Sequence, residues 1–232
     1  MGICLDNRLV AVARWVQSGQ VMADIGTDHA YLPCWLVLNG VCPKAIATDV
    51  AEGPYLRALQ TVTDLDLRAK VDIRLGPGLK VLGRGEAATI VMAGMGGRLI
   101  CELLQADMEK AAAASRLILQ AQREPELVRS WLIGHGWRII GDDLARDGKM
   151  WYNIIIAERG AMTLDEDHLL YGITEGVDPK LRREWLSFRA DGIQEIVTAL
   201  KDAPGAAAIE RQRELKQEAD RLKRLIAEVA IC

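Results

Sequence analysis

The sequence predicts an α/β protein, a doubly wound and mostly parallel sheet that is followed by a C-terminal α-helical hairpin. Between residues 21 and 135, apolar runs of strand length alternate with helical patterns five times, which is typical of strand-helix units on a parallel sheet. Two further runs, 137–144 and 150–157, flank Asp147-Gly148 and predict a closing antiparallel hairpin. After Gly160 the apolar spacing becomes helical, so we expect a sheet domain over residues 1–160 and a helical domain over 161–232.

Composition narrows the class of protein. The 232 residues are 50% hydrophobic and 26% charged, as in ordinary globular proteins, and the net charge of −3 gives no global basic field. A single basic face would still be enough to bind RNA. The five cysteines are scattered and lack C-x-x-C spacing, which argues against a zinc site and for a reduced, cytoplasmic setting. The chain has neither an apolar run of about 18 residues nor a signal-peptide pattern, so we expect no membrane association and no metal.

The first elements lead into the most informative stretch of the chain. Asp6 can cap a helix that runs from about residue 7 to 17. A buried strand begins at Val21 and turns tightly at Gly26, and a helix follows over about 30–38. In a parallel sheet, the turn after the first strand lies at the edge where such proteins bind nucleotide-like ligands.

The chemistry of that turn favours a cationic ligand. Gly26 lets a ligand approach the backbone, and it is flanked by Asp24 and Asp28. The G-x-G-x-x-G pattern of a pyrophosphate site is absent. S-adenosylmethionine, which carries a sulfonium and an ammonium group, has the expected charge. The alternative is a strand-to-helix turn with a capping aspartate.

A second acidic strand end supports the same site. The strand over 45–50 contains Asp49, which follows the first turn glycine by 23 residues, near the spacing of an acidic residue that binds ribose hydroxyls. In the alternative interpretation, Asp49 caps the helix over 52–63. A third strand over 71–75 ends in the turn Gly76-Pro77-Gly78.

The central strand ends in a run of glycines. The apolar run 87–93 leads into Gly94-Met95-Gly96-Gly97, which we interpret as a bare loop at the start of a helix that admits a flat ligand close to the main chain. A fifth strand over 116–120 and a helix over 124–135, ended by Gly136, complete the alternation.

The C-terminal segment predicts two helices that form an antiparallel hairpin. A break at 202–205 separates them, and the second helix spans about 206–230 with a seven-residue, coiled-coil-like repeat. The apolar positions of the first are Leu181, Trp185, Phe188, Ile196 and Leu200, and those of the second are Leu215, Ala219, Leu222, Ile226 and Val229. The basic residues of the second helix alternate with acidic residues, which favours a solvated face over an RNA-binding stripe.

Three motifs resemble the bacterial tRNA (adenine(22)-N(1))-methyltransferase family, the TrmK-like enzymes. They are Ala23–Pro33 (ADIGTDHAYLP), Ala93–Gly97 (AGMGG) and Trp131–Trp137, and the resemblance runs from Leu5 to about Gly160. It implies a Rossmann-like class I methyltransferase domain, S-adenosyl-L-methionine as cofactor, and tRNA as substrate and partner. The chain departs from the family at Pro77-Gly78-Leu79, where an Asn-Gly is usual, and at Ala121-Gln122, where a Pro-Asn is usual.

The resemblance and the strand ends together assign candidate site residues. For cofactor binding they are Asp24, Ile25, Gly26, Thr27, Asp28, His29, Asp49, Val50, Gly76, Pro77, Gly78, Ala93, Gly94 and Met95. For ordering the target base and for catalysis they are Asp28, His29 and Tyr31; for substrate binding they are Met95, Gly96, Gly97, Arg98 and Arg8. Arg8, Arg14 and Arg98 flank the expected mouth and are candidates for contacts with tRNA phosphates. In the alternative interpretation, Asp28 only caps a helix, His29 only bonds a neighbouring carbonyl, and Tyr31 only packs.

The expected reaction is transfer of a methyl group from S-adenosylmethionine to N1 of an adenine in tRNA, which the family places at position 22. Because N1 lies on the pairing edge, the adenine must be unpaired or flipped out. Two alternatives remain: a methyltransferase that acts on a small molecule or a protein, and a scaffold that keeps the fold without catalysis. A nicotinamide-dependent oxidoreductase ranks last, because the phosphate-binding glycines after the first strand are missing.

Overall fold

The structure is a computed structural model that describes residues 2–173, 177–201 and 205–229. It divides into two compact units, residues 1–176 and 177–232. The division falls after residue 176 rather than after residue 160, because a short helix that the sequence analysis did not predict, α7 (Glu166–Tyr171), packs on α6 (Pro125–Gly134) within the first unit. In the described residues, no helix is long and apolar enough to span a membrane.

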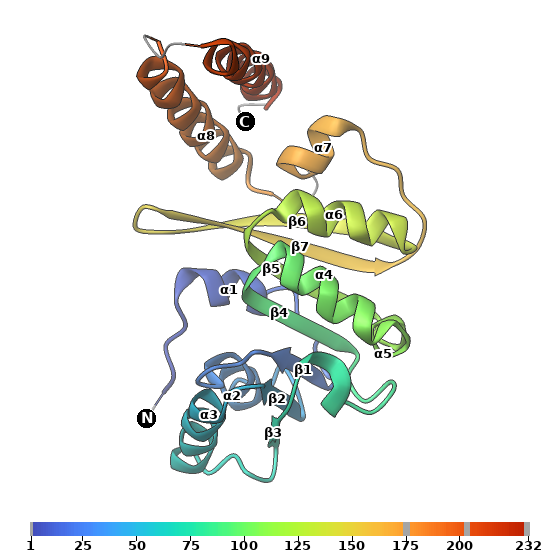
Figure 1. Ribbon diagram of the computed structural model, residues 1–232. Helices are drawn as coiled ribbons and strands as arrows, with labels where there is room; N and C mark the ends of the chain where they lie inside the picture. The colour runs from blue at the N-terminus through green and yellow to red at the C-terminus, as the bar shows by residue number, and fades with distance from the viewer. Residues whose placement is uncertain (1, 174–176, 202–204, 230–232) are drawn as a thin grey trace. The chain divides into compact units, whose positions relative to one another are not determined.

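The first unit is built on one seven-stranded sheet in the order β3-β2-β1-β4-β5-β7-β6 (Figure 1). The five strands β1 to β5 are parallel, and β7 runs antiparallel to both β5 and β6. The predicted doubly wound sheet with an antiparallel hairpin is therefore confirmed. The strands are β1 (Met22–Ile25), β2 (Ala45–Asp49), β3 (Val71–Leu75), β4 (Thr89–Gly96), β5 (Arg116–Arg123), β6 (Trp137–Asp147) and β7 (Met150–Arg159).

Helices cover both faces of this sheet, and each face has its own core. On one face, α1 to α3 bury residues such as Val12, Leu36 and Ala58 against Ile118 and Ile154. On the other face, α4 to α6 contribute residues that include Ile100, Ala111 and Leu132. The helices are α1 (Asn7–Ala13), α2 (Tyr31–Leu38), α3 (Glu52–Asp64), α4 (Gly97–Ala106) and α5 (Met108–Ala113), with a 3₁₀ turn, η1 (Gly78–Val81), after β3.

The strand order places a topological switch point between β1 and β4. From β1 the chain continues to β2 and β3 on one side, and from β4 it continues to β5 on the other. In doubly wound sheets the crevice outside the carboxyl ends of such strands binds the ligand. This is the edge at which Asp24, Asp49 and the segment 94–97 were predicted to meet.

The glycine-rich segment after the central strand is not the bare loop that the sequence predicts. β4 continues through Gly96, and α4 begins at Gly97. Met95 pairs with Ala121 and Gly96 with Arg123, with register shifts on both sides of Met95. Two bulges keep this end of β4 bonded to β5 while they change the direction of its backbone. The prediction of an unpaired loop is therefore wrong, and the cause is the extension of β5 to Arg123.

The second unit is a pair of packed helices, α8 (Pro179–Ala199) and α9 (Ala206–Glu228). Of the predicted repeat in α9, Leu215, Ala219 and Leu222 are buried. In α8 the buried residues include Trp185, whereas Phe188 and Ile196 are about half exposed at 51% and 49%. Of the predicted break at 202–205, residues 202–204 lie outside the described residues and Gly205 is the N-cap of α9; the predicted helix end at Ala230 also lies outside them.

Candidate active site

A cavity of about 400 Å³ opens at the carboxyl edge of β1 and β4. Its volume lies within the usual range for pockets that bind small molecules. Nine predicted site residues line it: Arg8, Asp24, Gly26, Thr27, Asp28, His29, Tyr31, Ala93 and Gly94. Asp6, Leu9, Leu32 and Gln122 complete the lining, and the sequence analysis assigned none of these four to the site.

Asp24 is a buried carboxylate at the base of the cavity. It lies in β1, is 6% exposed, and its Oδ2 accepts a 2.6 Å hydrogen bond from the Thr27 hydroxyl. Burial raises the pKa of Asp24 to about 6, against the opposing effects of the Thr27 hydrogen bond and the Arg8 charge; the nearby Asp49 charge raises it slightly. A carboxylate that is this poorly solvated gains most from a cationic ligand.

Asp49 connects three loops at the end of β2. Its Oδ2 accepts a hydrogen bond from the amide of Asp28 at 3.3 Å, and its Oδ1 accepts one from the amide of Ala51 at 3.0 Å. Its carbonyl oxygen accepts a hydrogen bond from the amide of Gly76 at 2.8 Å. Asp49 therefore fixes the loops after β1, β2 and β3 relative to one another. This role goes beyond that of a helix cap, which was the alternative interpretation.

The loop between β1 and α2 has an unusual backbone. Asp28 and Ala30 both have left-handed conformations, with φ of 53° and 55°. Non-glycine residues adopt this conformation at a cost of about 1–3 kcal/mol, and such residues cluster at functional sites. The N-cap of α2 is Ala30, without a side-chain cap, so Asp28 is not the helix cap of the alternative interpretation.

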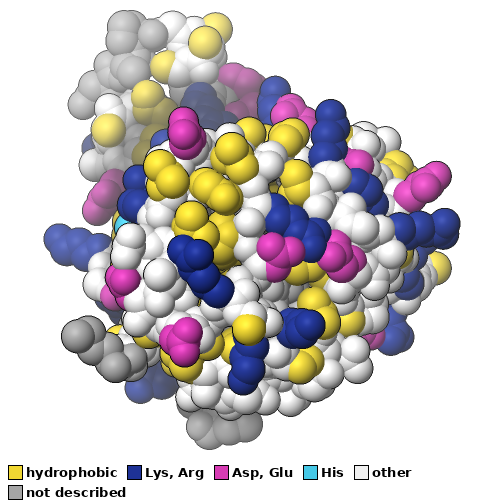
Figure 2. Space-filling view, turned by 90° about the horizontal axis from the view of Figure 1, so that it is seen from below, with side chains coloured by type: hydrophobic (Ala, Val, Ile, Leu, Met, Phe, Trp, Pro, Cys, Tyr) yellow, Lys and Arg dark blue, Asp and Glu magenta, His cyan; other side chains and the backbone are white. Residues whose placement is uncertain are grey.

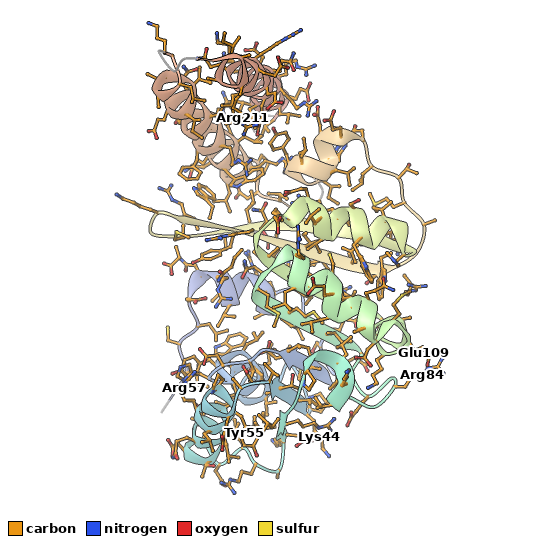
Figure 3. The ribbon with its side chains drawn as sticks, in the orientation of Figure 1. Lys44, Tyr55, Arg57, Arg84, Glu109 and Arg211 are labelled. Atoms are coloured by element: carbon orange, nitrogen blue, oxygen red, sulfur yellow. The ribbon has the colours of Figure 1, made fainter. Side chains whose placement is uncertain are left out.

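The Asp28 carboxylate instead contacts two other side chains. Arg57 of α3, labelled in Figure 3, donates to its Oδ1 from Nη2 at 2.5 Å and from Nε at 3.2 Å. His29 Nε2 lies 3.7 Å from its Oδ2, and the His29 ring stacks on Tyr31 with ring centroids 5.0 Å apart. The three residues predicted to order the target base thus form one cluster at the cavity wall. Arg57 is the member that the sequence analysis missed.

The glycine segment divides into residues with different surroundings. Gly94 has φ of 82° and lines the cavity beside Arg8 and Gln122. The Met95 side chain lies over Gly26, so it packs on the loop between β1 and α2. Gly96 has open space where a Cβ would be, whereas Gly97 is buried against the backbone of Arg123 and Glu124. The structure therefore gives Gly97 a packing reason for being glycine.

Gln120 joins the glycine segment to Arg8. Its side chain is fully buried in β5, and its Oε1 accepts a 2.9 Å hydrogen bond from the amide of Gly94 and a 3.3 Å hydrogen bond from Arg8 Nη1. Two donors on the oxygen fix the orientation of the amide. Its Nε2 is buried and has no hydrogen-bond partner in the part of the chain that the structure describes. Arg8 is further held by Asp6, at 3.7 Å.

The remaining predicted residues lie beside the cavity or away from it. Asp49, Val50, Gly76, Pro77 and Gly78 are outside its lining, on the side of β2 and β3, and Ile25 is buried in β1. Gly78 is buried with φ of 54°, and a Cβ there would lie 2.7 Å from the Leu103 side chain, so the position favours glycine. Arg98 is exposed on α4, and Arg14 is paired with Asp143 at 3.3 Å. Neither lines the cavity.

The fold and the acidic crevice at the switch point define an α/β methyltransferase type of protein. The family model described as "Methyltransferase domain" matches residues 5–155. The chain is 35% identical to the tRNA (adenine(22)-N(1))-methyltransferase of Bacillus subtilis (strain 168) over 95% of both chains. The crystal structure of the B. subtilis m1A22 tRNA methyltransferase TrmK matches with a TM-score of 0.81 and 31% identity, over 97% of this chain and 99% of that one.

A Streptococcus pneumoniae protein solved in complex with S-adenosyl-L-methionine matches with a TM-score of 0.82 and 32% identity, over 96% of this chain and 100% of that one. The chain belongs to the tRNA (adenine(22)-N(1))-methyltransferase family. The predicted fold class, family and enzyme class are thereby confirmed, with S-adenosylmethionine as cofactor.

The residues present fit that cofactor. Asp24 is a buried carboxylate that a cationic group would stabilise, and Gly26, with φ of 74°, lines the cavity beside it while the Met95 side chain fills the space where a Cβ would be. Asp49 holds the neighbouring loops in place at the end of β2. Within the described ranges, no group of three or more His, Cys, Asp or Glu side chains is arranged to hold a metal ion.

Proposed function

We propose that this protein methylates N1 of an adenine in tRNA, at the position that the B. subtilis relative's name gives as 22. The observation that carries the proposal is the two-sided cavity. One side presents Asp24, Gly26 and Thr27, and the other presents Arg8, Gly94 and Gln122. A cofactor and a base can therefore meet within one volume. We also propose a cytoplasmic location, because tRNA is the proposed substrate.

The chemistry requires positioning more than proton removal. S-adenosylmethionine, when bound, supplies an electrophilic methyl group on a sulfonium. N1 of a neutral adenine has a lone pair in the plane of the ring, so no base has to deprotonate it first. Holding the base in line with the methyl group can lower the barrier by about 7–11 kcal/mol. The ring becomes cationic on methylation, and the carboxylates of Asp6, Asp24 and Asp28 around the cavity favour that charge.

Each side of the cavity then has a role in the proposal. Asp24, Gly26 and Thr27 hold the methionine end of the cofactor, and Asp49 holds the ribose. The stacked pair of His29 and Tyr31 lies against the base, with Tyr31 43% exposed. Arg8, buried except for 21% of its side chain and fixed by Gln120, contacts the target nucleotide inside the cavity rather than at the outer surface.

Gln122 takes the position where the family usually has asparagine. Its amide lies beside Gly94 in the cavity lining. A primary amide can accept a hydrogen bond from the exocyclic amine of adenine and donate one to a ring nitrogen. We therefore assign Gln122 to base recognition.

The test is mass spectrometry of nucleosides from tRNA that has been incubated with the protein and S-adenosylmethionine. The proposal expects 1-methyladenosine from a transcript with adenine at position 22, and none from the same transcript with guanine there. Methylation of both transcripts would show that the methylated adenine is not at position 22. Labelling of protein or small molecules without tRNA would overturn the assignment of tRNA as the substrate. Calorimetry with S-adenosylhomocysteine separates a scaffold, which would not bind, from an enzyme with another substrate.

A further inference from the structure

The β6–β7 hairpin extends beyond its last pair with the neighbouring strand β5 at the cavity edge. The last pair between β5 and β7 is Ala121 with Asn153. β6 and β7 remain paired for three more positions: Ala145 with Tyr152, Arg146 with Trp151, and Asp147 with Met150. At about 3.4 Å per residue, these three pairs reach about 10 Å past the last β5 pair. In Figure 1 the tip projects beyond the other strands on the side where β6 ends. We call residues 145–152 the overhang.

Contacts within the overhang and with α1 make it rigid. The Arg146 guanidinium lies over the Trp151 ring, 5.2 Å from its centroid, and its Nε donates to the Gly148 carbonyl at 3.1 Å. Asn7 Nδ2 donates to the Arg146 carbonyl at 3.0 Å, which ties the overhang to the start of α1. An isolated two-stranded hairpin is marginal in water. These contacts therefore explain how the overhang keeps its shape, and a rigid arm loses little entropy on binding.

The residue types of the overhang suit RNA. It contains two cations, Arg146 and Lys149, and two aromatic residues, Trp151 and Tyr152, with Asp147 as its one acid. Lys149 is exposed at the turn, and Met150 beside it is 60% exposed. On the face that Figure 2 shows, Lys and Arg are interspersed with Asp and Glu. Cations together with aromatic rings form the usual surface for unpaired nucleotides, because phosphates pair with the cations and bases stack on the rings.

Arg8 makes the overhang continuous with the cavity. Its guanidinium lies 5.8 Å from the centroid of the Tyr152 ring, and the same side chain lines the cavity. Tyr152 is half-buried, and it points to the sheet face that α1 covers, as Ile154 and Ile156 do. A nucleotide next to one that occupies the cavity would therefore meet Tyr152 first and the turn at Lys149 next.

We propose that the overhang is an RNA-binding arm that holds the nucleotides next to the target adenine. This inference rests on the proposed function, since an adenine whose N1 is accessible has left its pair and its neighbours are partly unstacked. Tyr152 contacts a flanking base, and Lys149 contacts a flanking phosphate. The arm thereby contributes to substrate affinity and not to the cofactor site.

The first test concerns the charge at the turn. Lys149→Ala removes one phosphate contact, so we expect a several-fold weaker affinity for tRNA and a salt dependence that is shallower by about one unit. The matched control is Lys44→Ala. Lys44 immediately precedes β2 and therefore lies at the amino ends of the parallel strands, away from the cavity at their carboxyl ends (Figure 3). The control should leave tRNA affinity and its salt slope unchanged. Affinity for S-adenosylhomocysteine should be the same in all three proteins.

The second test concerns the aromatic ring. Tyr152→Leu keeps an apolar side chain against the core but removes the stacking surface, so we expect KM for tRNA to rise at least about fivefold with kcat little changed. Tyr152→Phe keeps the ring and should restore the wild-type KM. A similar loss in both variants would overturn the role of the ring.

Crosslinking on the unaltered protein does not depend on the folding of any variant. Ultraviolet crosslinking of the wild-type protein to tRNA, followed by trypsin digestion, should attach RNA to the peptide 150–159, which contains Trp151 and Tyr152. Crosslinks confined to other peptides would overturn the proposed RNA-binding role of the overhang. Equal tRNA affinity and salt slope for Lys149→Ala and wild type would also overturn it.

The methylation assay separates this inference from the proposed function. If the wild-type protein did not methylate tRNA at all, the proposed function itself would have failed. If the wild-type protein methylated tRNA but the overhang showed no effect in these tests, only the RNA-binding role of the overhang would be rejected. Binding of a protein rather than tRNA to the overhang would also overturn it.

Discussion

Thr27 holds the carboxylate of Asp24 with a hydrogen bond of 2.6 Å from its hydroxyl to Oδ2. A neutral donor only partly compensates for the loss of water around a group that is 6% exposed. The pKa of Asp24 therefore rises to about 6, with burial as the main cause. Ionised Asp24 is thus an unfavourable charge at the place where a cationic cofactor is expected.

The first prediction is that Asp24→Asn stabilises the protein and weakens cofactor binding. The folded state holds the Asp24 proton more tightly than the unfolded state, so the free energy of unfolding decreases as pH rises from about 4 to about 6. Removing the charge should increase that free energy by about 2–3 kcal/mol at pH 8, since one pKa unit corresponds to about 1.4 kcal/mol. Urea unfolding at pH 8 measures it.

The control for this experiment is Asp66→Asn. Asp66 is exposed, and its backbone has a left-handed conformation that asparagine also tolerates. It should leave both stability and cofactor affinity unchanged. If Asp24→Asn were less stable than wild type at pH 8, burial of the charge would not be the dominant effect at this position.

The second prediction concerns the pH dependence of cofactor binding. A cationic ligand favours ionised Asp24, so its affinity should be constant above about pH 7 and should fall below about pH 6, by up to about tenfold per pH unit. Binding near pH 5 should release a proton. Calorimetry with S-adenosylmethionine in two buffers of different ionisation enthalpy measures that proton directly. Asp24→Asn should show a weak and flat profile, and a flat profile for the wild type would contradict the assignment.

The sequence predicts where the site lies but not the contacts that build it. Strand ends, turn glycines and the spacing of Asp24 from Asp49 follow from local patterns, and each falls at the predicted edge of the sheet. The bond between Arg8 and Gln120 joins residues that are 112 positions apart, and the ion pair between Arg57 and Asp28 joins residues that are 29 apart. Such pairs depend on how α1 and α3 pack on the sheet, which no local pattern encodes.

The third prediction concerns the buried ion pair between Arg129 and Asp142. Both side chains are almost fully buried, with Nε to Oδ2 at 2.6 Å and Nη2 to Oδ1 at 2.9 Å. Arg129 Nη1 also donates to the Leu169 carbonyl at 3.0 Å, which attaches α7 to the sheet unit. Asp142→Ala leaves the guanidinium without its partner, so we expect a loss of about 3–5 kcal/mol in stability.

Hydrogen exchange should show the effect of that substitution on α7. Residues 166–171 should lose protection in Asp142→Ala, while the amides of β1 and β4 stay protected under conditions in which the protein remains folded. Removing both partners, in Arg129→Met with Asp142→Ala, should recover part of the lost stability. A double variant that is as unstable as the sum of the single ones would show that the pair has no coupling.

The fourth prediction uses two neighbouring glycines that differ in their surroundings. A Cβ at Gly97 would lie 2.9 Å from the Arg123 carbonyl oxygen and would also meet the backbone of Glu124. Since backbone can move little, Gly97→Ala should cost about 1–3 kcal/mol of stability through overpacking. A Cβ at Gly96 meets nothing within 4 Å, and φ of −71° suits alanine.

Gly96→Ala should therefore fold with a loss below about 1 kcal/mol, which comes from alanine being a poorer N-cap than glycine. If the end of β4 admits the target base close to the backbone, this methyl group should raise KM for tRNA several-fold while affinity for S-adenosylhomocysteine stays the same. Thermal unfolding and tRNA methylation kinetics on the two variants separate packing from substrate access. Full tRNA activity in Gly96→Ala would remove Gly96 from the substrate site, because its only remaining role would be to begin α4.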